Sequence, residues 1–172
     1  MKISELLQKH GSDKSGDHFY GELYDLLFTY RQYSTNSLLE LGVWKGQSLL
    51  AWQEFFPKAT IYGIDSNPFK YPFEFDSDRI KLLTFPQEAI HLVPVDFMLD
   101  IVIDDCSHVA WHQMYSFCYL QRFLSPVGIY IIEDVQSIEI ANAIKTIEPR
   151  FRIIDLRSVK NRHDDIIMVY EK

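Results

Sequence analysis

The chain has 172 residues, of which 47% are hydrophobic and 24% are charged, with only seven glycines and seven prolines. This length suits one domain, and this composition excludes disordered, collagen-like and low-complexity proteins. An excess of 24 acidic over 17 basic residues gives a formal charge of -7, so we expect no nucleic-acid partner.

No run of residues approaches the roughly 18 consecutive apolar side chains that a membrane span needs. The N-terminus alternates polar and apolar residues where a signal peptide would have an apolar core. We therefore expect a cytoplasmic protein with no membrane partner. The two cysteines, Cys106 and Cys118, lack a second pair, so we expect free thiols rather than a disulfide framework or a thiolate metal site.

The first part of the chain, residues 1–36, carries two helical patterns. Apolar side chains repeat at helical spacing over residues 3–10, which predicts an amphipathic helix. A second helix is predicted from Tyr20, because Tyr24 and Leu27 follow on the same face. We expect these helices to cover the rest of the domain.

Beyond this part, short apolar strands alternate with amphipathic helices. The first strand is predicted at SLLEL, residues 37–41, and a glycine loop leads from it into the helix QSLLAWQEFF. We expect another helix that is capped by Ser107 or His108 and ends before Pro126, and a third that is capped by Ser137. The remaining predicted strands are ATIYGID, Ile80–Thr84, LDIVIDD, GIYIIED, and a final pair, FRIIDLRS and DDIIMVYEK, joined by a polar turn with no helix between them.

Repeated strand–helix units require a mostly parallel sheet with right-handed crossovers and helices on both faces. The final strand pair adds an antiparallel hairpin. The expected fold class is therefore α/β, a Rossmann-like three-layer sandwich around a mostly parallel seven-stranded sheet. We expect residues 1–172 to form one domain, with residues 1–36 as a helical cover and residues 37–172 as the core.

A glycine loop follows the first strand of this predicted sheet. The strand ends Glu40-Leu41-Gly42, and Gly46 follows in G-V-W-K-G. Ligands of open α/β sheets bind beyond the carboxyl ends of the strands, and glycines let the backbone approach them. Because the loop lacks the middle glycine of the dinucleotide pattern, a pyrophosphate is not favoured. An NAD-dependent or nucleotide-sugar enzyme on a related fold stays an alternative.

Asp65 ends the second strand, about 20 residues beyond the glycine loop. A carboxylate at this position can accept both ribose hydroxyls of a nucleoside-type cofactor. The alternative is a solvated aspartate beside a turn.

Two pairs of acids close two later strands: Asp104 with Asp105, and Glu133 with Asp134. If these strands are neighbours, the four carboxylates meet at one edge and repel one another unless they bind a proton or a cation. Oxygen ligands of this kind suit Mg²⁺, Mn²⁺ or Ca²⁺ better than zinc. The alternative is that each pair only complements a helix dipole.

Five other side chains have two interpretations each. His108 follows the first acidic pair, where a neutral imidazole can act as a general base, and a cap or surface position is the alternative. We expect Lys14 to be solvated, with a contact to a carboxylate as the alternative. We expect Tyr20, Tyr24 and Trp44 in the core, with stacking on an aromatic ligand as the alternative.

Together these motifs resemble a known family. The chain resembles class I S-adenosylmethionine-dependent methyltransferases, specifically the metal-dependent sugar O-methyltransferases of macrolide biosynthesis (macrocin and mycinamicin type). These proteins have segments similar to L-L-E-L-G-V-W-K-G-Q-S-L, I-Y-G-I-D, D-I-V-I-D-D-C-S-H and G-I-Y-I-I-E-D. The early G-S-D-K with H-F-Y and the late R-H-D-D-I-I are similar too, so the resemblance covers nearly the whole chain. Its most specific part is D-D-x-S-H followed by E-D.

The resemblance implies an S-adenosylmethionine-dependent O-methyltransferase that acts on a hydroxyl of a small molecule, a sugar or a glycosylated natural product, with Mg²⁺ or Mn²⁺. It implies that His108 is the catalytic base. It implies that the metal ligands are Asp105, Glu133 and Asp134. It implies that the cofactor-binding residues are Glu40, Gly42, Gly46, Ser48, Asp65, Gln87 and Asp104.

The chain departs from the family pattern at one place. The family usually has G-D-Q where this chain has Phe85, Pro86 and Gln87, so Pro86 replaces the acid expected near the adenine. A cofactor-binding protein without turnover is therefore a second alternative. A homo-oligomer is left open.

Overall fold

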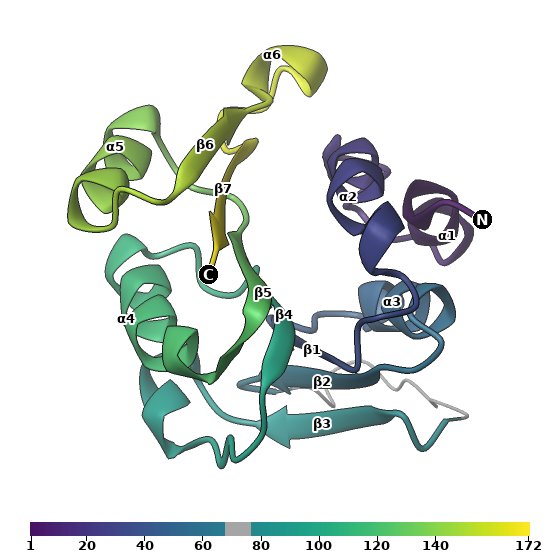
Figure 1. The fold of residues 1–172 in the computed structure, drawn as a ribbon. Coiled ribbons are helices and arrows are strands. Elements are labelled where there is room, and N and C mark those ends of the chain that lie inside the picture. The colour runs from purple at the N-terminus through teal and green to yellow at the C-terminus, as the bar shows by residue number, and fades with distance from the viewer. Residues whose placement is uncertain (68–76) are drawn as a thin grey trace.

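The computed structural model describes residues 1–67 and 77–172, which form one seven-stranded sheet with helices on both faces (Figure 1). The strand order is β3-β2-β1-β4-β5-β7-β6. The strands from β3 to β5 in this order are parallel to one another, whereas β7 is antiparallel to both β5 and β6. The predicted α/β class and sheet are thus confirmed. The strands are β1 (Ser37–Leu41), β2 (Thr60–Asp65), β3 (Ile80–Thr84), β4 (Leu99–Asp104), β5 (Leu124–Ile132), β6 (Arg152–Asp155) and β7 (Ile166–Glu171).

The helices form two layers. α1, α2 and α3 cover one face of the sheet, and α4 and α5 cover the other (Figure 1). Among the described residues, no helix combines the length and the apolar character that crossing a membrane requires. The helices are α1 (Ile3–Lys9), α2 (Tyr20–Phe28), α3 (Gln47–Phe55), α4 (Ala110–Leu120), α5 (Ile138–Ile147) and α6 (Arg157–Lys160), with 3-10 turns η1 (Thr29–Arg31), η2 (Gln87–Leu92) and η3 (Gln121–Phe123).

Each face of the sheet has its own hydrophobic core, because helices on both sides cover the central parallel strands. All five residues of β1 are buried. On one face, Tyr24 and Phe28 of α2 meet Trp52 of α3 edge-on, with ring centroids 5.2 and 5.9 Å apart. On the other face, the ring of Phe117 in α4 lies 4.7 Å from that of Phe151. The two cores hold the strand ends in fixed positions.

Strand β5 begins earlier than predicted. The sequence pattern predicts this strand from Gly128, but it starts at Leu124 and includes Pro126. The pairing with β4 shifts register between Leu99 and Ile101, so the segment around Pro126 lies outside the regular ladder. Proline lacks the N–H that a regular ladder uses, and an irregularity of this kind accommodates it.

The predicted cap of α4 is wrong, whereas that of α5 is confirmed. Val109, rather than Ser107 or His108, is the N-cap of α4, and its side chain makes no capping hydrogen bond. Ser137 caps α5, because its hydroxyl accepts a hydrogen bond from the Ile140 amide at 3.3 Å. The backbone of His108 is left-handed, with φ 56°, and is therefore already outside the helix.

A short helix, α6, lies between β6 and β7, where the sequence analysis expects a polar turn without a helix. Four residues are too few to give a recognisable helical period, which explains the missed element. The Nζ atom of Lys160 in α6 donates to the Gly16 carbonyl at 3.2 Å. The connection between the last two strands therefore contacts the segment that joins α1 to α2.

We expect Phe117→Ala to lower the free energy of unfolding by about 3–5 kcal/mol, because it leaves a cavity among three aromatic neighbours. Urea denaturation followed by circular dichroism measures the loss. The control is Trp111→Ala in the same helix, since Trp111 is 60% exposed and its loss should cost about 0.5 kcal/mol or less. Equal losses for the two variants would contradict this description of the core.

Candidate functional site

The main cavity has a volume of about 800 Å³ and lies at the carboxyl ends of β1, β2, β4 and β5. β1 pairs with β2 on one side and with β4 on the other, so the strand order reverses there. Ligands of open α/β sheets bind at this point. The wall consists of residues 12–14, 42–45, 47–48, 65–67, 86–88, 105–108 and 134.

The glycine loop after β1 packs directly against the end of β4. Gly42 has φ 86°, and a Cβ atom there would lie 2.0 Å from the Asp105 carbonyl oxygen. Gly46 has φ 72° and is the N-cap of α3. Gly42 is thus required because the Asp105 backbone, rather than a ligand, leaves no room for a side chain. Gly46 is favoured because its backbone is left-handed.

Asp65 supports the glycine loop from β2. Its Oδ2 accepts hydrogen bonds from the amides of Val43 at 2.9 Å and Trp44 at 3.3 Å, and its Oδ1 accepts one from Asn67 at 2.8 Å. Asp65 also lines the cavity. The predicted strand-end carboxylate therefore faces the cavity while it fixes two of the loops around it.

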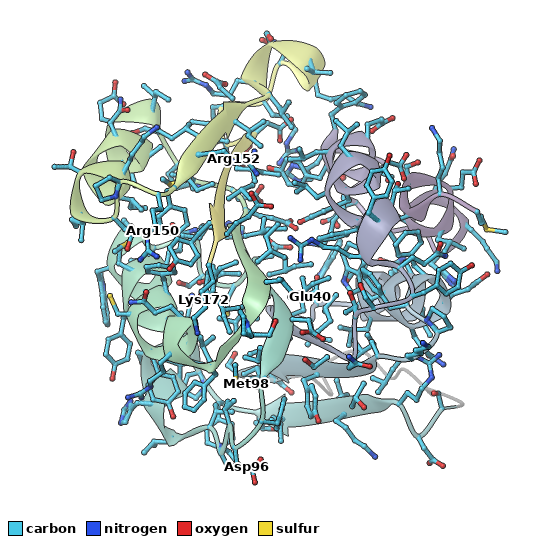
Figure 2. All side chains as sticks on the ribbon, viewed as in Figure 1. Glu40, Asp96, Met98, Arg150, Arg152 and Lys172 are labelled. Atoms are coloured by element: carbon cyan, nitrogen blue, oxygen red, sulfur yellow. The ribbon has the colours of Figure 1, made fainter. Side chains whose placement is uncertain are left out.

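Glu40 lies in the interior between the sheet and helix α3 (Figure 2). Its Oε2 accepts from the Ser48 hydroxyl at 2.8 Å and from Trp52 Nε1 at 3.2 Å. Its Oε1 is buried without a hydrogen-bond partner and lies 3.4 Å from Lys14 Nζ. Burial raises the pKa of Glu40 to about 7, although the Lys14 ammonium opposes this shift.

Asp104 is fully buried behind the cavity wall. It accepts hydrogen bonds from Gln87 Nε2 at 2.8 Å and from the Tyr130 hydroxyl at 3.2 Å. Burial raises the pKa of this carboxyl to about 7. Gln87 in turn accepts from the Ser107 hydroxyl at 2.6 Å, so Asp104 fixes a wall residue without facing the cavity itself.

Three predicted metal ligands, Asp105, Glu133 and Asp134, form what we call the acidic centre. One ligand atom each from Asp105, Asp134 and His108 lie within 4.8 Å of one another. His108 Nε2 is 3.1 Å from Asp105 Oδ1 and 3.6 Å from Asp134 Oδ2. Carboxylate oxygens suit a divalent cation such as Mg²⁺ or Mn²⁺, so Asp105 and Asp134 fit the group that the resemblance implies.

Glu133 is the member of the acidic centre that points away from the cavity. Its Oε2 accepts from Lys14 Nζ at 2.7 Å, and its Oε1 accepts from the Tyr24 hydroxyl. Burial raises the pKa of Glu133 well above its usual range in spite of the Lys14 ammonium, and the neighbouring carboxylates of Asp105 and Asp134 add to the rise. Both oxygens of Glu133 therefore already accept a hydrogen bond, one of them from a cation.

The expectation that Lys14 is solvated is wrong. Its side chain is 3% exposed, and its Nζ lies 2.5 Å from Asp105 Oδ2 as well as 2.7 Å from Glu133. Burial alone would raise the pKa of Asp105, but Lys14 and His108 outweigh it and lower that pKa to about 2. Carboxylates that are removed from water need a nearby cation, and the ammonium group supplies one.

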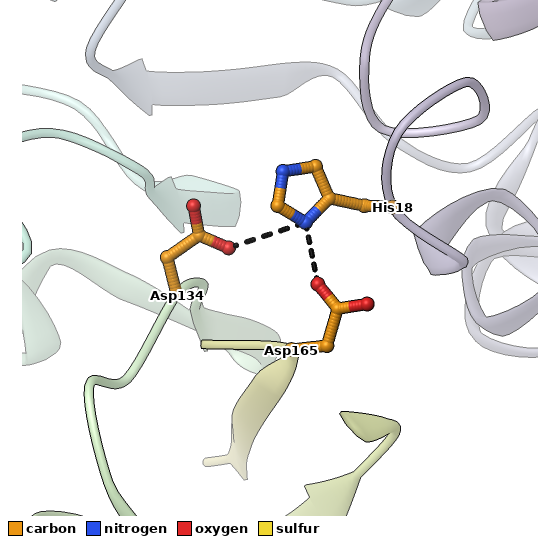
Figure 3. Close-up of side chains that lie close together, drawn as sticks. All are labelled: His18, Asp134 and Asp165. Carbon is orange, nitrogen blue, oxygen red and sulfur yellow. Dashed lines mark hydrogen bonds and ion pairs between the residues drawn. The ribbon is translucent and has the colours of Figure 1, made fainter. Parts of the chain in front are cut away.

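Sequence reasoning missed His18. Figure 3 shows this side chain between the carboxylates of Asp134 and Asp165. Its Nδ1 donates to Asp165 Oδ1 at 2.6 Å and lies 3.6 Å from Asp134 Oδ1. H-F-Y and R-H-D-D-I-I belong to the resemblance, but no local pattern predicts that these distant segments meet.

The aromatic residues near the site divide into two groups. Tyr20 and Tyr24 are fully buried, as predicted, and their hydroxyls donate to Asp134 and Glu133. Trp44 is 49% exposed and lines the cavity, so the prediction that it lies in the core is wrong.

Backbone strain collects around the cavity. Within the described ranges, the non-glycine residues with positive φ are Trp44, His108, Asp134 and Asn161, and the first three line the cavity. A left-handed backbone costs an L-residue about 1–2 kcal/mol, and such conformations cluster at functional sites. One of these residues, His108, contacts Asp105, three residues earlier, through its Nε2.

The fold and this cavity define a class of protein. The chain has the class I S-adenosylmethionine-dependent methyltransferase fold. It is similar in structure to MycE methyltransferase from the mycinamycin biosynthetic pathway, solved in complex with Mg, SAH and mycinamycin VI. The superposition covers 99% of this chain and 54% of MycE, with a TM-score of 0.75 and 25% sequence identity. No family model matches the chain.

Within that class, the chain is a homologue of sugar O-methyltransferases. It is 34% identical over 145 residues to 8-demethyl-8-(2-methoxy-alpha-L-rhamnosyl)-tetracenomycin-C 3'-O-methyltransferase of Streptomyces olivaceus. It is 33% identical over 147 residues to mycinamicin VI 2''-O-methyltransferase of Micromonospora griseorubida. Each alignment covers 77% of this chain and 36% of the relative, so the chain spans about a third of the length of these curated relatives.

We expect Gly42→Ala to lower the free energy of unfolding by about 3 kcal/mol or more, because a clash with backbone adds to the cost of positive φ. The matched control is Gly46→Ala, which has positive φ at the other end of the same loop and should cost only about 1–2 kcal/mol. Urea denaturation compares the two. A smaller loss for Gly42→Ala than for Gly46→Ala would show that the loop and β4 do not pack as described.

Proposed function

We propose that this chain is an S-adenosylmethionine-dependent O-methyltransferase module that acts on a hydroxyl of a sugar or a glycosylated natural product, assisted by Mg²⁺ or Mn²⁺. The observation that carries the proposal is one cavity that joins a glycine loop and Asp65 to an acidic centre with His108. Sugar O-methyltransferases among the relatives and the MycE complex with Mg and SAH support it.

The cofactor side of the cavity is the glycine loop with its supports. We assign Asp65 to the ribose hydroxyls, because it lines the cavity at the end of β2. We assign the methionine part to Glu40, Gly42, Gly46 and Ser48, because Gly42 and Ser48 line the cavity and Glu40 accepts a hydrogen bond from Ser48. Gln87 completes the cofactor-binding set from the cavity wall, and Asp104 supports it from behind by accepting a hydrogen bond from Gln87 Nε2.

The acidic centre is the proposed metal site, with Asp105, Glu133 and Asp134 as ligands. When bound, the cation would supply a Lewis acid that lowers the pKa of the acceptor hydroxyl, while S-adenosylmethionine would supply the methyl group. Asp105 and Asp134 face the cavity, whereas Glu133 takes part only if it exchanges its contact with Lys14 for the ion.

His108 is the proposed general base. The carboxylate of Asp105 accepts from its Nε2, which leaves Nδ1 to accept the proton of the acceptor hydroxyl. The hydrogen bond to Asp105 raises the pKa of His108, although burial opposes the shift, so the neutral ring is a stronger base than a free imidazole. The left-handed backbone and the contact with Asp105 hold the ring in place, which favours transfer by positioning.

We expect Asp65→Asn to weaken binding of S-adenosylhomocysteine by about 10- to 100-fold, because one carboxylate that accepts charged hydrogen bonds is lost. Calorimetry measures the dissociation constant. Asp155→Asn is the matched control, since Asp155 is exposed on β6 and pairs only with Arg157 among the described residues. An unchanged constant in a folded Asp65→Asn variant would remove Asp65 from the cofactor site, and tighter binding of NAD than of S-adenosylhomocysteine would overturn the function.

We expect His108→Gln to lower kcat about 10²- to 10⁴-fold on a rhamnosylated or macrolide acceptor, with little change in S-adenosylhomocysteine affinity.

We expect chelation to abolish transfer by the unaltered chain and Mg²⁺ or Mn²⁺ to restore it. Release of labelled methyl product measures both effects. The control is His91→Gln, whose ring bonds to the Tyr115 hydroxyl away from the cavity. A folded His108→Gln variant with full kcat would exclude the base, and turnover after exhaustive chelation would exclude the metal.

A further inference from the structure

One short segment, from Lys14 to Tyr24, supplies hydrogen-bond donors to every carboxylate of the acidic centre. Lys14 contacts Asp105 and Glu133. Tyr24 donates to Glu133, and Tyr20 donates to Asp134. Lys14 lies 91 positions away in sequence from Asp105 and 119 from Glu133, so only the tertiary fold brings them together.

We propose that Lys14, His18 and Tyr20 are positioning residues of the metal site. Lys14 and Tyr20 donate to one oxygen each of Asp105 and Asp134, which we call the inner oxygens, and His18 stacks on Tyr20. The other oxygen of each carboxylate, which we call the outer oxygen, is left for one divalent cation. This inference rests on the proposed metal-assisted function. It concerns residues that contact the ligands and not the cation itself.

Asp134 shows the arrangement most clearly. Its Oδ1 accepts from the Tyr20 hydroxyl and lies 3.6 Å from His18 Nδ1. Its Oδ2 lies 3.6 Å from His108 Nε2, on the cavity side. The two oxygens of one carboxylate thus have separate partners, an inner set from the N-terminal segment and an outer one at the cavity.

Asp105 repeats this division with different partners. Its Oδ2 lies 2.5 Å from Lys14 Nζ, and its Oδ1 lies 3.1 Å from His108 Nε2. The inner oxygens of both carboxylates are therefore held by the segment, and the outer oxygens of both face the same imidazole. A divalent cation held by Asp105 and Asp134 from the cavity would leave their contacts with Lys14 and Tyr20 intact.

His18 and Tyr20 are themselves fixed. His18 Nδ1 donates to Asp165 Oδ1 at 2.6 Å (Figure 3). The rings of His18 and Tyr20 stack with centroids 4.6 Å apart. The Tyr20 hydroxyl is 3.3 Å from Asp165 Oδ1, and Asp165 is fully buried. Side chains that are fixed in this way and contact the metal ligands orient the ligand oxygens. Their loss typically weakens metal binding by about 10- to 100-fold.

His18, Asp134 and Asp165 lie close enough to hold an ion of their own, since their ligand atoms are within 4.8 Å of one another. Two observations favour hydrogen bonding instead. Asp165 Oδ1 already accepts from His18, and the guanidinium Nε of Arg162 lies 3.5 Å from the same oxygen. A positive guanidinium beside the site opposes a second cation.

The test is Mn²⁺ binding to the full chain, measured by calorimetry and by electron paramagnetic resonance of the bound ion. We expect one ion per chain in the unaltered protein. Tyr20→Phe removes only the hydroxyl that donates to Asp134, and we expect it to raise the Mn²⁺ dissociation constant about 10- to 100-fold and to change the spectrum of the ion that still binds. The matched control is Tyr119→Phe, which loses a hydroxyl that donates to the Val93 carbonyl at 3.3 Å and should leave both readouts unchanged.

His18 gives a second, independent variant pair. His18→Asn keeps a donor close to the position of Nδ1 and should retain Mn²⁺ affinity within about threefold, whereas His18→Ala should weaken it about tenfold or more. Lys14 is unsuited to this test, because its removal leaves buried carboxylates without a cation and endangers the fold. Thermal midpoints establish that each variant is folded.

The outcomes separate the two levels of the proposal. If the unaltered chain binds S-adenosylhomocysteine but no Mn²⁺, the metal part of the proposed function fails and this inference fails with it. If it binds one ion and folded Tyr20→Phe and His18→Ala bind as tightly as the control, only the positioning role is overturned. Two ions per chain, with one lost in His18→Ala, would make His18 a ligand and also overturn that role.

Discussion

The structure depends on the burial of several carboxylates at one edge of the sheet. Glu40, Asp104, Glu133 and Asp165 are each at most 1% exposed, and Asp134 is 6% exposed. An isolated carboxylate in such surroundings takes up a proton or needs a partner. For Glu133, Asp134 and Asp165, side chains of the N-terminal segment provide these partners, among them the ammonium group of Lys14. The position of this segment and the geometry of the site therefore depend on the same contacts.

This constraint explains why the N-terminal helices pack where they do. Tyr24 belongs to the aromatic cluster with Trp52, and its hydroxyl reaches Glu133 at the same time. Trp52 packs against Tyr24 and also donates to Glu40. The apolar core on this face and the acidic edge thus share side chains, and a change in one alters the other. Aromatic residues with a polar end suit a boundary between the two.

Local sequence patterns predict the sheet and the two acidic pairs at its edge, but they do not predict the N-terminal residues that contact these acids. Strand periodicity and the D-D and E-D pairs predict that Asp105 and Asp134 approach each other, because β4 and β5 are adjacent and parallel. Lys14 and His18 carry no such signal, since their partners lie 91 to 147 positions away. Lysine is ordinarily solvated, so its burial becomes predictable only when the number of buried carboxylates is known.

The alternation of side chains along a strand explains why the acids occur in pairs. Successive residues of a strand point to opposite faces, so two adjacent acids at a strand end serve two different places. Asp104 faces Gln87 and Tyr130 in the interior, whereas Asp105 faces Lys14 and His108. The second pair divides in a similar way: Glu133 turns inward to Lys14, and Asp134, with φ 52°, turns to the cavity. In each pair one acid is bound by interior side chains, and the other lines the cavity.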